Sequence, residues 1–102
     1  MTKRELIEEV VHARTDLPRR EVEALVNGVF ETLSDALARG ERIEIRGFGS
    51  FKTKKRKGRM ARNPRTGAQV QVDEHYVPFF KVSKELRSIV NDNLKKNPPP
   101  SL

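Results

Sequence analysis

The sequence predicts an α+β fold, in which an N-terminal helical hairpin precedes a three-stranded antiparallel sheet with a long β-hairpin arm and a short C-terminal helix. Three observations support this class. Apolar residues recur with a helical period before Gly40, and after it they alternate with a period of two. Between two of the alternating segments, residues 52–67 carry eight basic side chains and no acidic one. We therefore expect strands that extend into a charged projection.

The first helix is predicted to begin at Thr2, because Thr2 and Glu5 have the spacing of a capping box with two reciprocal hydrogen bonds. It should end near Arg14, since the next residues are turn-like and Pro18 suits the first turn of another helix. One stripe of this first helix is apolar, with Leu6, Ile7, Val10 and Val11.

The second helix has the strongest helical pattern, with apolar residues at i, i+3, i+4 and i+7: Val22, Leu25, Val26, Val29, Phe30, Leu33 and Leu37. Gly40 is placed to end it, as the residue that follows the C-cap. The polar face is acidic, with Glu21, Glu23, Glu31 and Asp35. Neither helix therefore presents a basic recognition face.

The strands begin after Gly40. Residues 42–46 alternate Ile with charged side chains, residues 47–49 form a Gly-Phe-Gly turn, and Phe51 opens a second strand. Alternation resumes at residues 68–72, and Val77, Phe79, Phe80 and Val82 return to core composition. Between them, residues 63–67 read Asn-Pro-Arg-Thr-Gly, which predicts a type I turn with a bulge at the tip of a hairpin. The arm, about residues 52–72, would project roughly 30 Å.

A last helix is predicted from Ser83, a good N-cap, with Leu86, Ile89, Val90 and Leu94 on one face. Residues 95–102 contain three consecutive prolines and read as a disordered, extended tail. The expected organisation is one domain over residues 1–94, followed by this tail.

Composition points to a polyanion as partner. Residues 1–44 carry a net charge of −3, residues 45–72 of +9 and residues 73–102 of +1, within a formal total of +7. A lipid surface would favour a basic amphipathic helix, and the basic cluster has no helical pattern, so nucleic acid is the preferred partner. The chain has no cysteine and no apolar run near the roughly 20 residues of a membrane span. A cytoplasmic protein is expected.

The apolar faces predict an intertwined dimer. Without arm and tail, roughly 70 residues remain to form a core, which is near the lower limit for a stable domain. The second helix is apolar along its length, and Phe48, Phe51, Phe79 and Phe80 add large side chains to the same small body. A two-fold axis would present two arms to one duplex.

The Gly-Phe-Gly-Ser-Phe segment at residues 47–51, followed by Arg-Asn-Pro-Arg-Thr-Gly at residues 62–67, resembles the bacterial HU and integration host factor family over residues 1–94. Residues 40–46 and 76–78 are most similar to the integration host factor beta subunit. HU and integration host factor are established examples of DNA-bending proteins that act in the minor groove. The resemblance therefore implies an architectural protein of the bacterial nucleoid, a dimer whose arms wrap the duplex.

The same resemblance implies roles for single residues. Pro64 matches a wedge that enters between base pairs, and Glu44 and Arg46 match positions that help to read a preferred sequence. Residues expected to contact DNA are Lys3, Arg46, Lys52, Lys54, Arg56, Arg59, Arg62, Asn63, Pro64, Arg65 and Lys84. Lys3 and Lys84 are included because helix N-termini bind phosphate. The expected partners are double-stranded DNA and a second copy or a related subunit. No catalytic residue, metal, cofactor, membrane or small-molecule substrate is expected.

Several alternatives stay open at this stage. Pro64 is also a common turn former, and Glu44 and Arg46 also fit the solvent face of a strand. The basic hairpin could extend into folded RNA, as in a ribosomal protein, or the Pro-rich tail could serve as a ligand in a protein-interaction module. His12 and His75 lie far apart and lack nearby ligand-type residues, so neither predicts a metal site.

Overall fold

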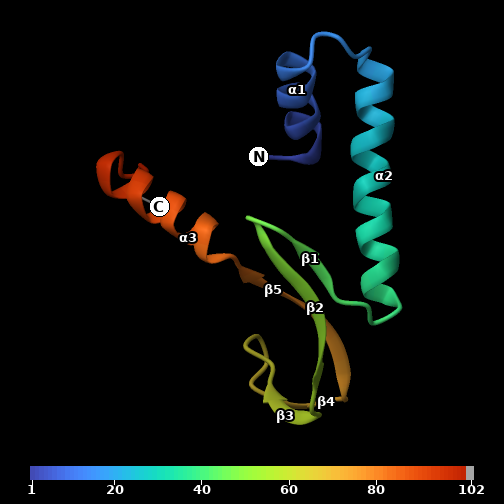
Figure 1. Cartoon of the computed structure of the whole chain (residues 1–102). Helices are drawn as coiled ribbons and strands as arrows, with labels where there is room; N and C mark the ends of the chain where they lie inside the picture. Colours follow the sequence, from blue (N-terminus) through green and yellow to red (C-terminus); the bar gives the residue numbers. More distant parts are fainter. Residues whose placement is uncertain (101–102) are drawn as a thin grey trace.

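A computed structural model describes residues 1–100 and confirms the α+β class (Figure 1). The elements follow in the order α1 (Lys3–Ala13), α2 (Arg19–Ala38), β1 (Ile43–Ile45), β2 (Gly49–Arg56), β3 (Arg59–Arg62), β4 (Gln69–Val72), β5 (His75–Val82) and α3 (Lys84–Lys96). The helical hairpin lies at one end of the molecule and the tip of the β-hairpin at the other (Figure 1).

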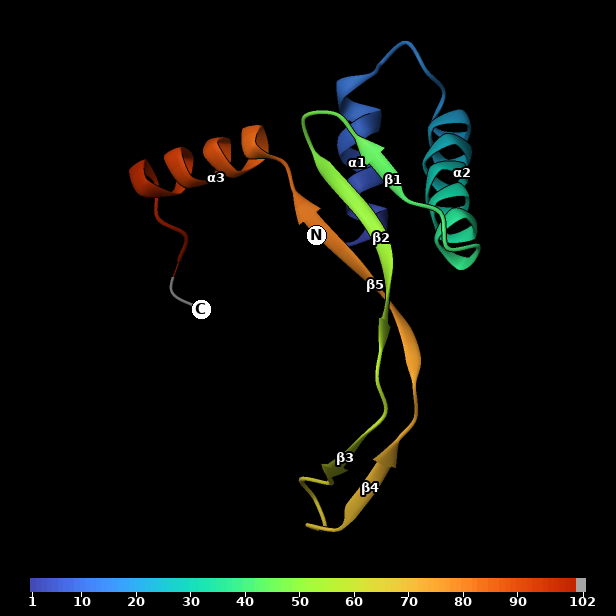
Figure 2. The same cartoon turned by 60° about the horizontal axis from the view of Figure 1, so that its bottom comes forward.

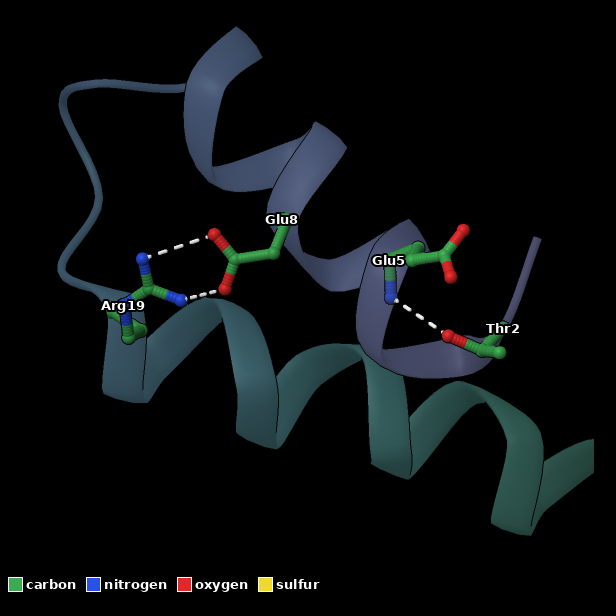
Figure 3. Close-up of polar contacts among 4 residues, drawn as sticks. All are labelled: Thr2, Glu5, Glu8 and Arg19. Atoms are coloured by element: carbon green, nitrogen blue, oxygen red, sulfur yellow. Dashed lines mark hydrogen bonds and ion pairs between the residues drawn. The ribbon is translucent and has the colours of Figure 1, made fainter.

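The ends of α1 and α2 follow from local chemistry. Thr2 caps α1, because its Oγ1 accepts a hydrogen bond from the Glu5 backbone N at 3.2 Å (Figure 3). Within residues 1–100, no hydrogen bond runs from the Thr2 backbone N to the Glu5 carboxylate, so the predicted capping box is only half formed. Pro18 is the N-cap of α2, one residue before the predicted position. Gly40 has φ +79° and ends α2 after its C-cap, as predicted.

An ion pair joins the two helices of the hairpin. Arg19, at the start of α2, donates two hydrogen bonds to the Glu8 carboxylate of α1, one of them from Nη2 to Oε2 at 3.1 Å (Figure 3). The hydrogen bonds from Arg19 lower the pKa of Glu8 below its ordinary value. Ile7 and Val22 are buried between the helices. The hairpin is therefore fixed by a small apolar contact and an exposed bidentate pair.

The sheet has the strand order β1-β2-β5, and both of its pairs are antiparallel. Phe51 on the central strand faces Ile43 on one side and Phe80 on the other. The ring centroids of Phe51 and Phe80 lie 4.7 Å apart. Gly49 is buried beneath this cluster, where an added Cβ would lie 2.5 Å from the Lys81 carbonyl oxygen. A glycine is thus required by close packing at the start of β2.

The long hairpin is divided into two paired segments. Pairing of β2 with β5 ends at Arg56 and His75, and pairing of β3 with β4 begins at Arg59 and Val72. Two residues on each side, 57–58 and 73–74, lie between the segments without ladder pairing. The ribbon changes direction at this place (Figure 2). The expected arm exists, with an elbow that periodicity did not reveal.

The C-terminal helix is longer than predicted. Ser83 is its N-cap, as expected, and Ser83 Oγ accepts a hydrogen bond from the Leu86 backbone N at 3.0 Å. The helix continues to Lys96, so Lys95 and Lys96 are helical although the sequence placed them in the tail. Lysines in the last turn are favourable there because they face the negative end of the helix dipole. Residues 101–102 of the predicted tail lie outside the described residues.

A single chain does not enclose its own apolar residues. Among the described residues, the buried apolar side chains are Ile7, Val22 and Ala36, whereas Leu25 and Ile89 are 61% and 64% exposed. The radius of gyration is 18.8 Å, against about 13 Å for a compact domain of 100 residues. The molecule extends over 55 × 37 × 29 Å. Apolar faces on α2 and α3 are therefore left open to solvent.

Candidate nucleic-acid interface

The central strand β2 separates two kinds of side chain onto two faces. Thr53 Oγ1 donates a hydrogen bond to the Leu37 carbonyl oxygen at 3.1 Å, so the odd-numbered residues of β2 face α2. Because side chains of a strand alternate, Lys52, Lys54 and Arg56 lie on the opposite side, which we call the outer face. Three cations of the basic cluster are thereby presented together, away from the helices.

The neighbouring strands add to this outer face. Strand register places Glu44 and Lys81 on either side of Ser50, and Phe79 beside Lys52. The Lys54 Nζ lies 3.6 Å from the centroid of the Phe79 ring, a cation–π contact. Lys54 as a whole is half-buried. The outer face is thus basic, with an aromatic ring that orients one of its cations.

A cleft of about 560 Å³ lies where the outer face meets the start of α3. Its cationic side chains are Arg42, Arg46, Lys81 and Lys84, around the β1–β2 turn and the capping Ser83. Arg42 is paired with Glu44 at 2.9 Å, whereas the other three have no carboxylate within 4.0 Å among residues 1–100. The N-terminus of α3 adds backbone N–H groups and a positive dipole end. The cleft therefore attracts an anion such as phosphate.

The tip of the arm is an ordered turn with Pro64 exposed. The Gly67 N donates to the Asn63 carbonyl oxygen at 2.7 Å, and Gly67 has φ +74°. The bond spans five residues, so the loop contains an α-turn. Gly67 has the left-handed conformation that the sequence predicted there, and the type I turn with a bulge stays a prediction. Asn63 Oδ1 accepts from the Arg65 backbone N at 2.8 Å. The Asn63 side-chain oxygen is therefore engaged in shaping the tip.

The arm arginines do not share one face. In the β3–β4 pair, Arg59 lies opposite Val72 and Arg62 opposite Gln69, three residues apart along β3. Side chains three apart in a strand point to opposite faces, so Arg59 and Arg62 flank the ribbon. Arg65 lies in the turn itself. Such a ribbon carries positive charge on both sides.

Two of the residues expected to contact DNA line this cleft, and two of its cationic residues were not expected there. Arg46 and Lys84, which were expected separately to contact DNA, line the same cleft, but Lys3 is on α1 and lines a separate small cleft with Leu6 and Phe30. Arg42 and Lys81 are cleft residues that the sequence reasoning missed. Lys81 could have been found by continuing the alternation of β5 past Phe79.

Other chemistries find no support in the described part of the chain. Across residues 1–100, no cluster of three or more His, Cys, Asp or Glu side chains could hold a metal ion. His75 Nδ1 lies 2.9 Å from the Asp73 carbonyl oxygen, a local backbone contact. None of the helices in this range is long and apolar enough to cross a membrane.

Comparisons with known proteins agree with a nucleic-acid interface. The family model described as "Bacterial DNA-binding protein" matches residues 1–91. The HU–DNA cocrystal structure from Anabaena is similar at 30% identity and TM-score 0.76, with 97% of this chain and 100% of that chain covered. A point mutant of HU from Thermotoga maritima is 32% identical, with TM-score 0.63 and coverage of 88% and 99%.

A mutant of transcription factor 1 is similar in fold, at 21% identity and TM-score 0.63, with 95% of this chain and 97% of that chain covered.

Proposed function

This chain belongs to the family of bacterial DNA-binding proteins, and on that premise we propose that it is an architectural protein that binds and bends double-stranded DNA in the nucleoid. One observation carries the proposal. Lys52, Lys54 and Arg56 share the outer face of β2, and the same hairpin continues into an arm with arginines on both sides. The proposal involves no chemical change of the DNA, so the protein acts by binding alone.

Phosphate neutralisation supplies most of the affinity in this proposal. The cations of the outer face and arm line a path for the duplex backbone, and the cleft at the start of α3 receives a flanking phosphate. Lys54 is held in place by Phe79, so less conformational entropy is lost when it meets a phosphate. Lys3 lies on α1, outside this cleft, so in this proposal it reaches the duplex only within a larger assembly.

That assembly is a dimer in this proposal. The exposed apolar residues of α2 and α3, including Leu25 and Ile89, are large and lie on faces that would be buried by a second chain. The extended shape of one chain supports the same view, because these faces do not pack into a core within that chain. Two-fold symmetry would carry two arms to opposite sides of one bend. The second chain is either a copy or a related subunit.

The wedge is assigned to Pro64. It is exposed at the tip of the arm, and the hydrogen bonds of the turn fix its orientation. A rigid apolar ring at the end of a basic ribbon fits the apolar wedges that unstack a base step from the minor groove. Its role as a turn former is compatible with this, because the same geometry exposes the ring.

Sequence preference is assigned to the base of the arm. Residues 40–46 and 76–78 resemble the integration host factor beta subunit, and Glu44 and Arg46 both line the cleft. Glu44 is paired with Arg42, whereas Arg46 has no carboxylate partner among residues 1–100. We therefore propose that Arg46 reads the bases or the groove, and that Glu44, held by Arg42, belongs to the same readout site.

The salt dependence of duplex binding tests the proposal. If between six and twelve phosphates are contacted by a dimer, log K falls with log salt at a slope between about −5 and about −11. A slope near −1 would refute the arm model. Competition between duplex DNA and structured RNA is the second part of the experiment, since an A-form helix offers no comparable groove to a wedge. Preference for RNA would favour the alternative function. Mass in solution, with and without duplex, measures the assembly.

A further inference from the structure

The elbow of the arm is the feature that the proposed function does not use. We define it as residues 57–58 and 73–74, which interrupt the ladder between the two paired segments. Asp73 and Glu74 are the only acidic residues between Glu44 and Glu85. Two carboxylates in a segment built to approach phosphate are electrostatically unfavourable for DNA binding itself. Their position at the bend suggests a structural task.

One of these carboxylates is paired across the elbow. The Lys55 Nζ lies 3.0 Å from Glu74 Oε1, and the two residues stand on opposite sides of the hairpin. Lys55 belongs to the β2 face turned toward α2, on the same side as Thr53. A phosphate bound on the outer face therefore does not compete directly for Lys55. The pair can persist while DNA is bound.

The two sides of the hairpin also approach each other closely at the elbow. A Cβ added at Gly58 would lie 2.9 Å from the Val72 carbonyl oxygen and 3.3 Å from the Glu74 backbone N. Real Cβ contacts are rarely so short, so any larger residue would push the two sides apart. Gly58 thus permits the close approach, and the ion pair of Lys55 with Glu74 lies directly beside it.

We infer that Glu74 is a positioning residue: by holding Lys55 it fixes the angle at which the arm leaves the sheet. This inference rests on the proposed function for its consequence, that the angle sets the geometry from which the duplex is bent. Both side chains are a little over half exposed, 55% and 56%. Exposed pairs shift a conformational equilibrium by up to about five-fold. The effect expected is therefore a change of population between arm angles.

Distance measurements on the DNA-free protein test the angle directly. The chain has no cysteine, so Glu31→Cys on α2 and Gln69→Cys on β4 give two unique spin-labelling sites. Doubly labelled chain is refolded with an excess of unlabelled chain, so that the measured distances lie within one chain. The variants are Glu74→Gln, Lys55→Glu and the double exchange Lys55→Glu with Glu74→Lys. Asp73→Asn is the matched control, because the carboxylate of Asp73 has no ion-pair partner within residues 1–100.

The expected result is a shifted or broadened distance distribution in Glu74→Gln and Lys55→Glu, in which the ratio of the main arm angle to the other angles falls by up to about five-fold. Asp73→Asn keeps the wild-type distribution, and the double exchange restores it. Gly58→Ala shifts the distribution by steric contact alone and shows that the labels detect the elbow. A wild-type distribution in Glu74→Gln, or no recovery in the double exchange, overturns the inference.

Energy transfer across an end-labelled duplex then tests the consequence for DNA. Glu74→Gln should change the bend and the double exchange should restore it, whereas an unchanged bend overturns the link between elbow and DNA. The two proposals remain separable. If the wild-type protein does not bend DNA at all, the proposed function fails, while the distances in the free protein still report on the elbow.

Discussion

Comparison of two lysines on one strand gives the sharpest test of the proposed interface. Lys52 lies on the outer face of β2, and Lys55 lies on the face turned toward α2, paired with Glu74. The residues are three positions apart in a segment that composition alone treats as uniformly basic. Lys52→Gln should therefore weaken the salt dependence of DNA binding, and Lys55→Gln should have a clearly smaller effect on it.

The size of the effect follows from counterion release. Each phosphate contact contributes about 0.9 to the slope of log K against log salt, and a dimer loses two contacts, so the slope becomes less steep by about 1.8. Between 50 mM and 200 mM salt, the loss of affinity would then be about twelve-fold smaller for Lys52→Gln than for the wild type. Lys55→Gln removes no cation of the outer face, so any change of slope that it causes through the elbow should be smaller than the change caused by Lys52→Gln.

Fluorescence anisotropy titrations of a labelled duplex, at several salt concentrations, measure both slopes. Circular dichroism confirms that each variant is folded. Equal slopes for the two variants would refute the assignment of faces, because charge would then act without regard to which side of β2 carries it. A larger effect for Lys55→Gln would mean that the duplex lies on the face turned toward α2. That result would refute the proposed interface.

Four further predictions follow from the structure. Pro64→Ala should keep most of the binding and lose bending, seen as lower end-to-end energy transfer on a short duplex; unchanged transfer excludes the wedge. Arg46→Ala should reduce the difference between preferred and random sites with little loss at random sites. Gly49→Ala should destabilise the fold by about 1–3 kcal/mol in denaturant titrations, because its Cβ meets the Lys81 carbonyl. Glu8→Gln should lower stability at pH 7, and the gap should close below about pH 4, since the lowered pKa of Glu8 stabilises the fold only while the carboxylate is ionised.

Local chemistry made much of the fold predictable from sequence. Thr2, Ser83 and Gly40 mark helix ends in the structure as they do in the sequence, because capping involves only a few neighbouring residues. The apolar period separated helices from strands, and the change at Gly40 marked the boundary. The clustered charge and the Asn-Pro-Arg-Thr-Gly turn placed the arm and its tip. The bond from Gly67 N to the Asn63 carbonyl oxygen, which closes the tip, is a detail that residue types alone did not specify.

Tertiary structure decided what depends on strand register. Whether Lys52 or Lys55 faces outward follows from the hydrogen bond of Thr53 to the end of α2, which no local pattern contains. Likewise Lys81 and Arg42 enter the cleft only because β1 and β5 both pair with β2. The elbow arises where the ladder of one hairpin is interrupted on both sides at once. The sequence alone determined which elements form and where charge accumulates, and long-range pairing determined which charges act together, since a one-residue change of register moves every side chain to the opposite face.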